Sequence, residues 1–270
     1  MPMWKVTTFD DLKRQIAEIR ALGLGLLTNF FPNPARHGLW IEKGDCFTER
    51  VENSLFIVKK SPSFWNVYFC SATQVGLEAD WKVFVSRNPG VTMVSDIVGR
   101  EVQCGPLMGL LTGAGFRETA SLMRMTRMAV PMSYESDASV RFATGSDLPL
   151  IARLLHQFFD ERTEQLPYDE ELAGFMAQHR ILVCEEDGYL AGFLIFELSS
   201  ATLYLRYWFT HPDFRGRKVG SRLMRRFFEE GKETRRQILW VMRTNGDAIE
   251  KYRHYGFVEE DMFDHVMQFN

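Results

Sequence analysis

The sequence predicts an α+β protein made of two domains, and three observations support this. The chain has 270 residues, about twice the usual length of one domain. Helical and strand-like apolar periodicities are interspersed along it. A polar stretch that begins at Pro131 and runs to residue 139 has neither periodicity and marks a boundary. We therefore expect domains over residues 1–135 and 138–270.

Composition excludes several classes of protein. The hydrophobic share of 46% and the charged share of 25% are those of an ordinary folded chain. A net charge of -3, from 32 Lys and Arg against 35 Asp and Glu, provides no general attraction to nucleic acid or anionic lipid. The four cysteines form no C-x-x-C pair, which argues against a zinc knuckle, a redox dithiol or a disulfide framework. Without a secretory leader pattern or a bilayer-length apolar run, we expect a cytoplasmic protein with neither metal nor membrane partner.

The first half begins with a helix over residues 10–22, where Leu12, Ile16 and Ile19 recur at helical spacing. Prolines at 32 and 34 end it. Short apolar runs separated by turn residues then predict an antiparallel meander. The expected strands lie at residues 39–41, 54–58 and 64–70, followed by a strand at 91–95, a helix at about 105–112 and a last run to about residue 130.

The second half alternates helices and strands more clearly. Ser146 and Asp147 are placed to cap a helix with an apolar stripe. Asp187 and Gly188 predict a hairpin turn, and Gly256 predicts a left-handed helix end. The expected strands are 139–144, 181–185, 190–197, 202–210 and 237–242, and the expected helices follow residue 147 and cover 169–178, 219–230 and a segment that begins at Asp247.

A loop rich in glycine and cations joins the strand at 202–210 to the helix at 219–230. Backbone N–H groups without intrahelical partners point outward at a helix start, and the helix dipole adds partial positive charge. Arg215, Arg217 and Arg222 add local charge. The sequence therefore predicts a phosphate site here, with a solvated basic loop as the alternative.

Two motifs carry a resemblance to a known family. The loop Arg215-Gly216-Arg217-Lys218-Val219-Gly220 resembles the R/Q-x-x-G-x-G/A loop that binds the acyl-CoA pyrophosphate in GNAT superfamily N-acetyltransferases. Lys218 replaces the first motif glycine, and we expect it to keep a negative φ. The segment from Asn245 to Phe257 is similar to the family's N-x-x-A-x-x-x-Y-x-x-x-G-F helix. The resemblance covers residues 139–270 and implies a GNAT fold there, with a mixed, mostly antiparallel sheet between helices.

The resemblance implies acetyl-CoA as cofactor and transfer of an acetyl group to a primary amine of a small molecule or peptide, by direct attack on the thioester. Tyr252 would protonate the leaving sulfur, unless it only packs against the cofactor. Tyr204 stands where many members have a glutamate, so Glu197 is the candidate base. The cofactor would contact Trp208, Phe209, Thr210, Arg215, Gly216, Arg217, Lys218, Val219, Gly220, Ser221 and Asn245.

The first half resembles the second half in its order of elements, but less clearly. Residues 107–125 repeat the order of residues 250–268: a helix, Gly-Phe, an acidic turn and a strand. This favours tandem GNAT-like domains, the first degenerate because it lacks the basic loop and the tyrosine; an unrelated α+β accessory domain is the alternative. We expect this half to wall the acceptor cleft without transferring acetyl groups.

Two other functions stay open: an acyl-CoA-binding regulator without turnover, and transfer to aminoacyl-tRNA or peptide ends. The balanced charge of both halves argues against a large nucleic-acid contact. A monomer or a homodimer fits the sequence equally.

Overall fold

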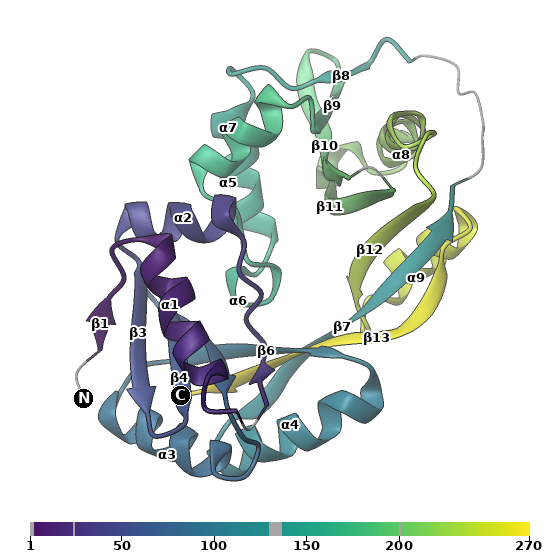
Figure 1. Ribbon diagram of the computed structural model, residues 1–270. Helices are drawn as coiled ribbons and strands as arrows, with labels where there is room; N and C mark the ends of the chain where they lie inside the picture. Colours follow the sequence, from purple (N-terminus) through teal and green to yellow (C-terminus); the bar gives the residue numbers. More distant parts are fainter. Residues whose placement is uncertain (1–2, 24, 130–136, 200) are drawn as a thin grey trace. The chain divides into compact units, whose positions relative to one another are not determined.

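The structure is a computed structural model that describes residues 3–23, 25–129, 137–199 and 201–270 (Figure 1). It divides into two compact units, Met1–Leu122 with Asp261–Asn270 and Met123–Glu260. This division differs from the expected 1–135 and 138–270 at two long strands, β7 (Arg117–Met128) and β13 (Val258–Phe269), because each passes from one unit into the other. Residues 130–136 of the expected boundary lie outside the described residues.

The first unit is built on a mostly antiparallel sheet in the order β1-β3-β4-β5-β6-β13-β7. Its core joins the sheet to two helices through aromatic side chains such as Phe56, Trp81 and Phe116. The elements are β1 (Trp4–Lys5), α1 (Phe9–Arg20), β2 (Leu27–Thr28), α2 (Pro34–Lys43), β3 (Cys46–Val51), β4 (Ser54–Lys60), β5 (Trp65–Ser71), α3 (Leu77–Arg87), β6 (Met93–Gly99) and α4 (Glu101–Gly113).

The expected strand at residues 39–41 is wrong, because this segment lies within α2. Asn33 caps the helix by accepting a hydrogen bond from Arg36 N–H at 3.1 Å, and a proline fits the first helical position. Gly44 ends the helix in the left-handed conformation. The apolar run instead carries Trp40 into the core, where it is 2% exposed.

In the first unit, the parallel strands β5 and β6 separate after two paired residues on each. The chain's own residues 27–30 lie along β5 beyond that point, with β2 paired to its end. Asn29 joins both strands: its side-chain oxygen accepts from Phe69 N–H at 2.7 Å, and its amide donates to Asp96 O at 2.9 Å. We call residues 27–30 the plug segment.

The second unit has the sheet order β7-β12-β11-β10-β9-β8. Helices α5 and α7 pack on one face of the sheet, and α8 covers the other (Figure 1). The elements are β8 (Val140–Phe142), α5 (Leu148–Phe158), α6 (Glu161–Glu164), α7 (Asp169–Ala177), β9 (Ile181–Glu186), β10 (Tyr189–Leu198), β11 (Thr202–Thr210), α8 (Val219–Glu230), β12 (Arg236–Met242) and α9 (Gly246–His254), with a short 3-10 turn at Pro212–Phe214.

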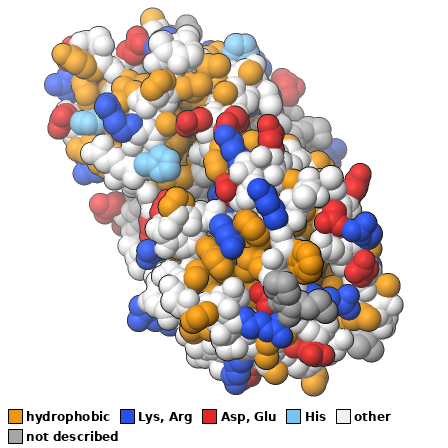
Figure 2. Space-filling view, turned by 90° about the vertical axis from the view of Figure 1, so that its left-hand side faces the viewer, with side chains coloured by type: hydrophobic (Ala, Val, Ile, Leu, Met, Phe, Trp, Pro, Cys, Tyr) orange, Lys and Arg blue, Asp and Glu red, His pale blue; other side chains and the backbone are white. Residues whose placement is uncertain are grey.

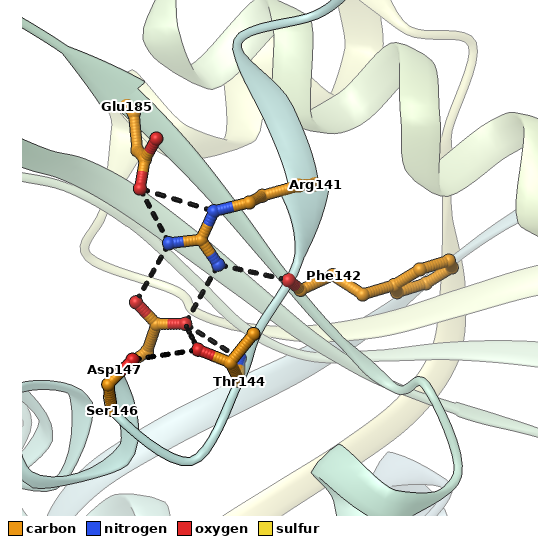
Figure 3. A network of polar contacts seen from close by, with 6 residues as sticks. All are labelled: Arg141, Phe142, Thr144, Ser146, Asp147 and Glu185. Carbon is orange, nitrogen blue, oxygen red and sulfur yellow. Dashed lines mark hydrogen bonds and ion pairs between the residues drawn. The ribbon is translucent and has the colours of Figure 1, made fainter.

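An ion network fixes the start of α5 (Figure 3). The Arg141 guanidinium donates to both carboxylate oxygens of Asp147, at 2.8 and 3.0 Å, and also contacts Glu185. Asp147 accepts from Thr144 N–H at 2.7 Å. Asp147 thus precedes the helix as expected but turns its carboxylate away from the helical N–H groups. Its hydrogen bond with Arg141 is the main cause that lowers its pKa to about 2.

All four cysteines are buried free thiols. Among the described residues, no helix has the length and apolarity to cross a membrane, and no group of His, Cys, Asp or Glu side chains is arranged to hold a metal ion. On the face drawn in Figure 2, Lys and Arg side chains are interspersed with Asp and Glu, in keeping with the balanced composition.

Candidate functional site

The second unit opens its sheet between β11 and β12. These parallel strands pair from Thr202↔Arg236 to Leu205↔Leu239 and no further, whereas β11 stays paired with β10 as far as Thr210. A register shift in the β10 pairing leaves Arg206 as an extra residue, a bulge that turns the strand. The two parallel strands therefore separate beyond Leu205.

The end of β11 presents backbone groups to this opening. His211 N–H donates to Ala191 O at 2.9 Å, and hydrogen-bonded pairs alternate along an antiparallel ladder. The backbone of Phe209 therefore bonds β10, whereas the N–H and C=O groups of Trp208 and Thr210 face the opening. The indole N–H of Trp208 is buried without a hydrogen-bond acceptor among the described residues.

Helix α8 begins beside this opening without a side-chain cap. Its first intrahelical bond is from Arg222 N–H to Lys218 O at 3.0 Å, so the N–H groups of Val219, Gly220 and Ser221 precede the helical ladder. A Cβ at Gly220 would lie 2.8 Å from the Trp208 ring, so glycine is what lets the helix approach β11. A helix start with N–H groups of this kind is suited to binding an anion.

The expectation of a negative φ at Lys218 is wrong. Lys218 precedes α8 with φ 62°, in the left-handed region, and Gly216 also has a positive φ of 82°. A residue with a Cβ pays about 1–2 kcal/mol for this conformation. The loop therefore keeps the backbone path that the motif glycine would take, at a cost in stability.

The loop is also less basic than its sequence suggests, because acidic residues of β9 and the following turn pair with it. Arg217 contacts Asp187 at 2.8 Å, and Arg222 pairs with Glu186. Lys218 stays exposed. A cavity of about 340 Å³ opens at this point, lined by Asp137, Glu186, Arg217, Lys218, Ser221, Arg222 and Arg225.

Helix α9 places Tyr252 at the same opening. The helix ends in a Schellman motif: Gly256 has φ 85°, and Phe257 N–H donates to Tyr252 O at 3.0 Å. The Tyr252 ring lies 5.5 Å from that of Trp208 and is 8% exposed. Burial, and secondarily the charge of Glu164, raise the pKa of Tyr252 above its ordinary value, so the hydroxyl is protonated at neutral pH.

Asn245, and not the expected Asp247, begins α9. Its side-chain oxygen accepts from Ala248 N–H at 3.2 Å, an N-cap contact that leaves its amide group as a donor.

A second polar group lies on the face of β11 opposite α8. The Arg206 guanidinium lies 5.3 Å from the Tyr204 ring and 3.1 Å from Glu197. The carboxyl of Glu164 interacts with the charge of Arg206, and burial raises its pKa to about 7. We call Glu164, Tyr204, Arg206, Tyr207 and Glu197 the β11 polar cluster.

Sequence reasoning missed Glu164 and Arg206. A cation amid the apolar run of β11 was a signal for Arg206. Glu164 stands in a polar loop and gave no signal of its own. The predicted base, Glu197, is 47% exposed and forms an ion pair with Arg206.

Comparisons with known proteins agree with this geometry. The acetyltransferase (GNAT) family matches residues 148–257. A curated uncharacterized N-acetyltransferase of Methanocaldococcus jannaschii is 43% identical over 56 residues, which are 20% of this chain and 25% of that protein. The matched part thus spans a quarter of the curated relative.

Solved structures share the fold over most of the chain. A tandem GNAT protein from the clavulanic acid biosynthesis pathway aligns over 99% of this chain and 97% of its own, with a TM-score of 0.62 and 12% identity. A GNAT-family acetyltransferase of Colwellia psychrerythraea aligns over 100% and 99%, with a TM-score of 0.59 and 11% identity. A GCN5-related N-acetyltransferase of Sphaerobacter thermophilus aligns over 80% and 76%, with a TM-score of 0.58 and 16% identity. These likenesses confirm the expected class, α+β with tandem GNAT-like domains.

Proposed function

Because residues 148–257 carry a GNAT acetyltransferase domain, we propose that this protein is an acetyl-CoA-dependent N-acetyltransferase whose acceptor is a primary amine of a small molecule or peptide. The observation that carries the proposal is the opening between β11 and β12, because three independent parts meet there: free strand backbone, an uncapped helix start and a buried tyrosine hydroxyl. GNAT proteins typically use acetyl-CoA, and these residues fit it.

The pyrophosphate would be held by the backbone N–H groups of residues 218–221, with the exposed Lys218 as counter-charge. The backbone of Trp208 and Thr210 would pair with the amide-bearing arm as with an added strand. The Trp208 indole N–H, buried without an acceptor among the described residues, would gain one. Arg215, Gly216, Arg217, Val219, Gly220 and Ser221 shape this loop, Phe209 aligns β11, and Asn245 has a free amide donor.

Acetyl-CoA supplies the acetyl group as a thioester, and this chain's residues do the rest. Tyr252 holds a proton that a departing sulfur can take, because its raised pKa keeps the hydroxyl protonated at neutral pH. No hydrogen bond between described residues engages that hydroxyl. The acceptor amine would approach from the β11 polar cluster.

Binding and turnover test the proposal separately. Calorimetry should detect one acetyl-CoA site per chain, and a panel of amines should release free CoA thiol. Lys218→Glu should weaken acetyl-CoA binding about tenfold or more, because it reverses a charge at the phosphate site. Arg153→Glu, an exposed cation on α5, is the matched control and should leave binding unchanged. Failure to bind acyl-CoA would end the proposal.

One observation favours an acyl-CoA-binding regulator as a second candidate: Tyr204 stands where many family members carry a glutamate. Such a regulator would bind acetyl-CoA without releasing thiol in the presence of any amine.

A further inference from the structure

We propose that Glu164, the last residue of α6, is the group that takes the proton from the attacking amine. The assignment rests on the proposed acetyl transfer, and it places the base on α6 instead of at Glu197 of β10.

The backbone around Glu164 is held in place from several sides. Asp160 caps α6 by accepting from Arg162 N–H at 2.9 Å, and Gln165 reverses the chain with φ 47°. The Tyr207 hydroxyl donates to the carbonyl of Glu164 at 3.1 Å and to that of Gln165 at 3.4 Å. The turn of α6 is thereby tied to β11, one residue beyond the Arg206 bulge.

The charge of the carboxyl interacts electrostatically with titratable groups on three elements. These are Arg206 and Tyr207 of β11, Tyr252 of α9, and Asp160, the cap of α6. The side chain is half-buried, and no hydrogen bond between described residues ends on its oxygens. Glu164 is thus fixed to β11 through its backbone, and its carboxylate is still able to accept a proton.

Glu197 is less suited to this role. It is 47% exposed, and its carboxylate is already paired with the Arg206 guanidinium at 3.1 Å. Glu164 is less exposed, and burial raises its pKa to about 7, although Arg206 opposes the shift. A carboxyl near pH 7 is far better matched to proton removal at neutral pH.

The step balances with no further reactant. The nitrogen lone pair of a neutral amine forms the C–N bond as the C–S bond breaks, one nitrogen proton passes to Glu164, and the sulfur takes the proton of Tyr252. The proton on Glu164 then returns to Tyr252, directly or through water, which restores both groups. An amine that arrives as an ammonium first gives its additional proton to solvent.

The test combines a pH profile with thermal stability, using an amine accepted by the wild-type protein. The wild-type kcat/KM should rise with pH through an apparent pKa near 7. In Glu164→Gln this rise of kcat/KM with pH should be absent, and kcat should fall about 10²-fold or more, with acetyl-CoA affinity unchanged. The rise should persist in two other variants: Glu197→Gln, which removes the competing base, and Glu161→Gln, on the same short helix.

A readout without turnover comes from unfolding. A raised pKa means that the folded state binds the proton more tightly, so ionisation of Glu164 costs stability as the pH rises from about 5 to 8. Glu164→Gln should therefore have a higher Tm than the wild type at pH 8 and little difference at pH 5. The assignment would be overturned if the rise of kcat/KM with pH persisted in Glu164→Gln, or if it disappeared in Glu197→Gln alone. Both outcomes presuppose CoA release, so they are distinct from failure of the acetyltransferase proposal.

Discussion

The two units end their last helix in the same way but with different side chains. In the first unit, Gly115 has φ 99° and Phe116 N–H donates to Leu111 O at 3.0 Å, the same Schellman motif that Gly256 and Phe257 make with Tyr252. Leu111 is fully buried in the core, where the second unit has a tyrosine at its opening. The backbone motif persists in both units, and the tyrosine is present in one.

The openings between the parallel strands differ as well. The first unit fills its opening with the plug segment, whose Asn29 bonds to β5 and β6. In the second unit, β11 beyond Leu205 keeps only its β10 ladder. Helix α3 begins after Gly76, in the left-handed region, with Glu78 and Asp80 in its first turn, which would repel a phosphate. A unit can therefore keep the fold's packing while its own chain occupies the opening between the parallel strands.

The largest expected effect is on the tyrosine that the first unit lacks. Tyr252→Phe should lower kcat about 10²-fold or more, since the sulfur would leave without its proton donor. Acetyl-CoA binding and Tm should change little, because the ring packing against Trp208 remains. Tyr255→Phe, three residues along the same helix, is the control, measured by CoA release. An unchanged kcat would show that Tyr252 is not the proton donor, and it would not affect the family match of residues 148–257.

The next effect concerns the plug segment. Asn29→Ala should destabilise the protein by about 2–3 kcal/mol, since the Phe69 N–H and the Asp96 carbonyl lose their partner together. Urea unfolding measures this, and Asn53→Ala, at an exposed side chain, should cost little. Calorimetry should still count one acetyl-CoA site per chain in Asn29→Ala. A second site would show that the plug segment alone keeps acetyl-CoA from binding to the first unit.

How far the sequence alone could go differs between these regions. The strand, loop and helix from Thr202 to Glu230 were predicted almost to their ends, because an amphipathic stripe and a glycine-rich turn are local signals. Residues 39–41 were misassigned, since three apolar residues fit either a strand or a helix, and the Asn33 cap was overlooked. Glu164 could not be found, because its pKa depends on burial and on Arg206, 42 positions away. The plug segment is likewise a tertiary arrangement.

A smaller effect distinguishes the starts of α1 in the first unit and α5 in the second. The Asp147 carboxylate has a folded-state pKa of about 2, below its ordinary 3.8, so it stabilises the fold above pH 4 and loses this effect as the pH falls towards 2. Asp147→Asn should cost about 2 kcal/mol at pH 7 and much less at pH 2. Thr8→Ala removes the neutral cap of α1, a bond from Asp11 N–H at 3.1 Å, and should cost about 1 kcal/mol. That cap contains no ionisable acceptor. If the stability losses in Asp147→Asn and Thr8→Ala depended equally on pH, this difference between the two helix starts would be contradicted.

The smallest effect tests the left-handed residues at two helix starts: Gly76 before α3 in the first unit and Lys218 before α8 in the second. Lys218→Gly should raise the free energy of unfolding by about 0.5–1 kcal/mol, because glycine has no Cβ to strain at φ 62°, and its greater freedom in the unfolded chain offsets only part of the gain. Lys218→Ala keeps the Cβ and loses the same charge, so it should give no such gain in urea unfolding. Both variants should bind acetyl-CoA more weakly than the wild type by similar factors. If Lys218→Ala bound acetyl-CoA weakly and Lys218→Gly did not, the loss of the ammonium could not be the cause, because both variants lose it. The backbone conformation at residue 218 would then control the affinity of this loop, and glycine, which the first unit has at Gly76, would favour binding there.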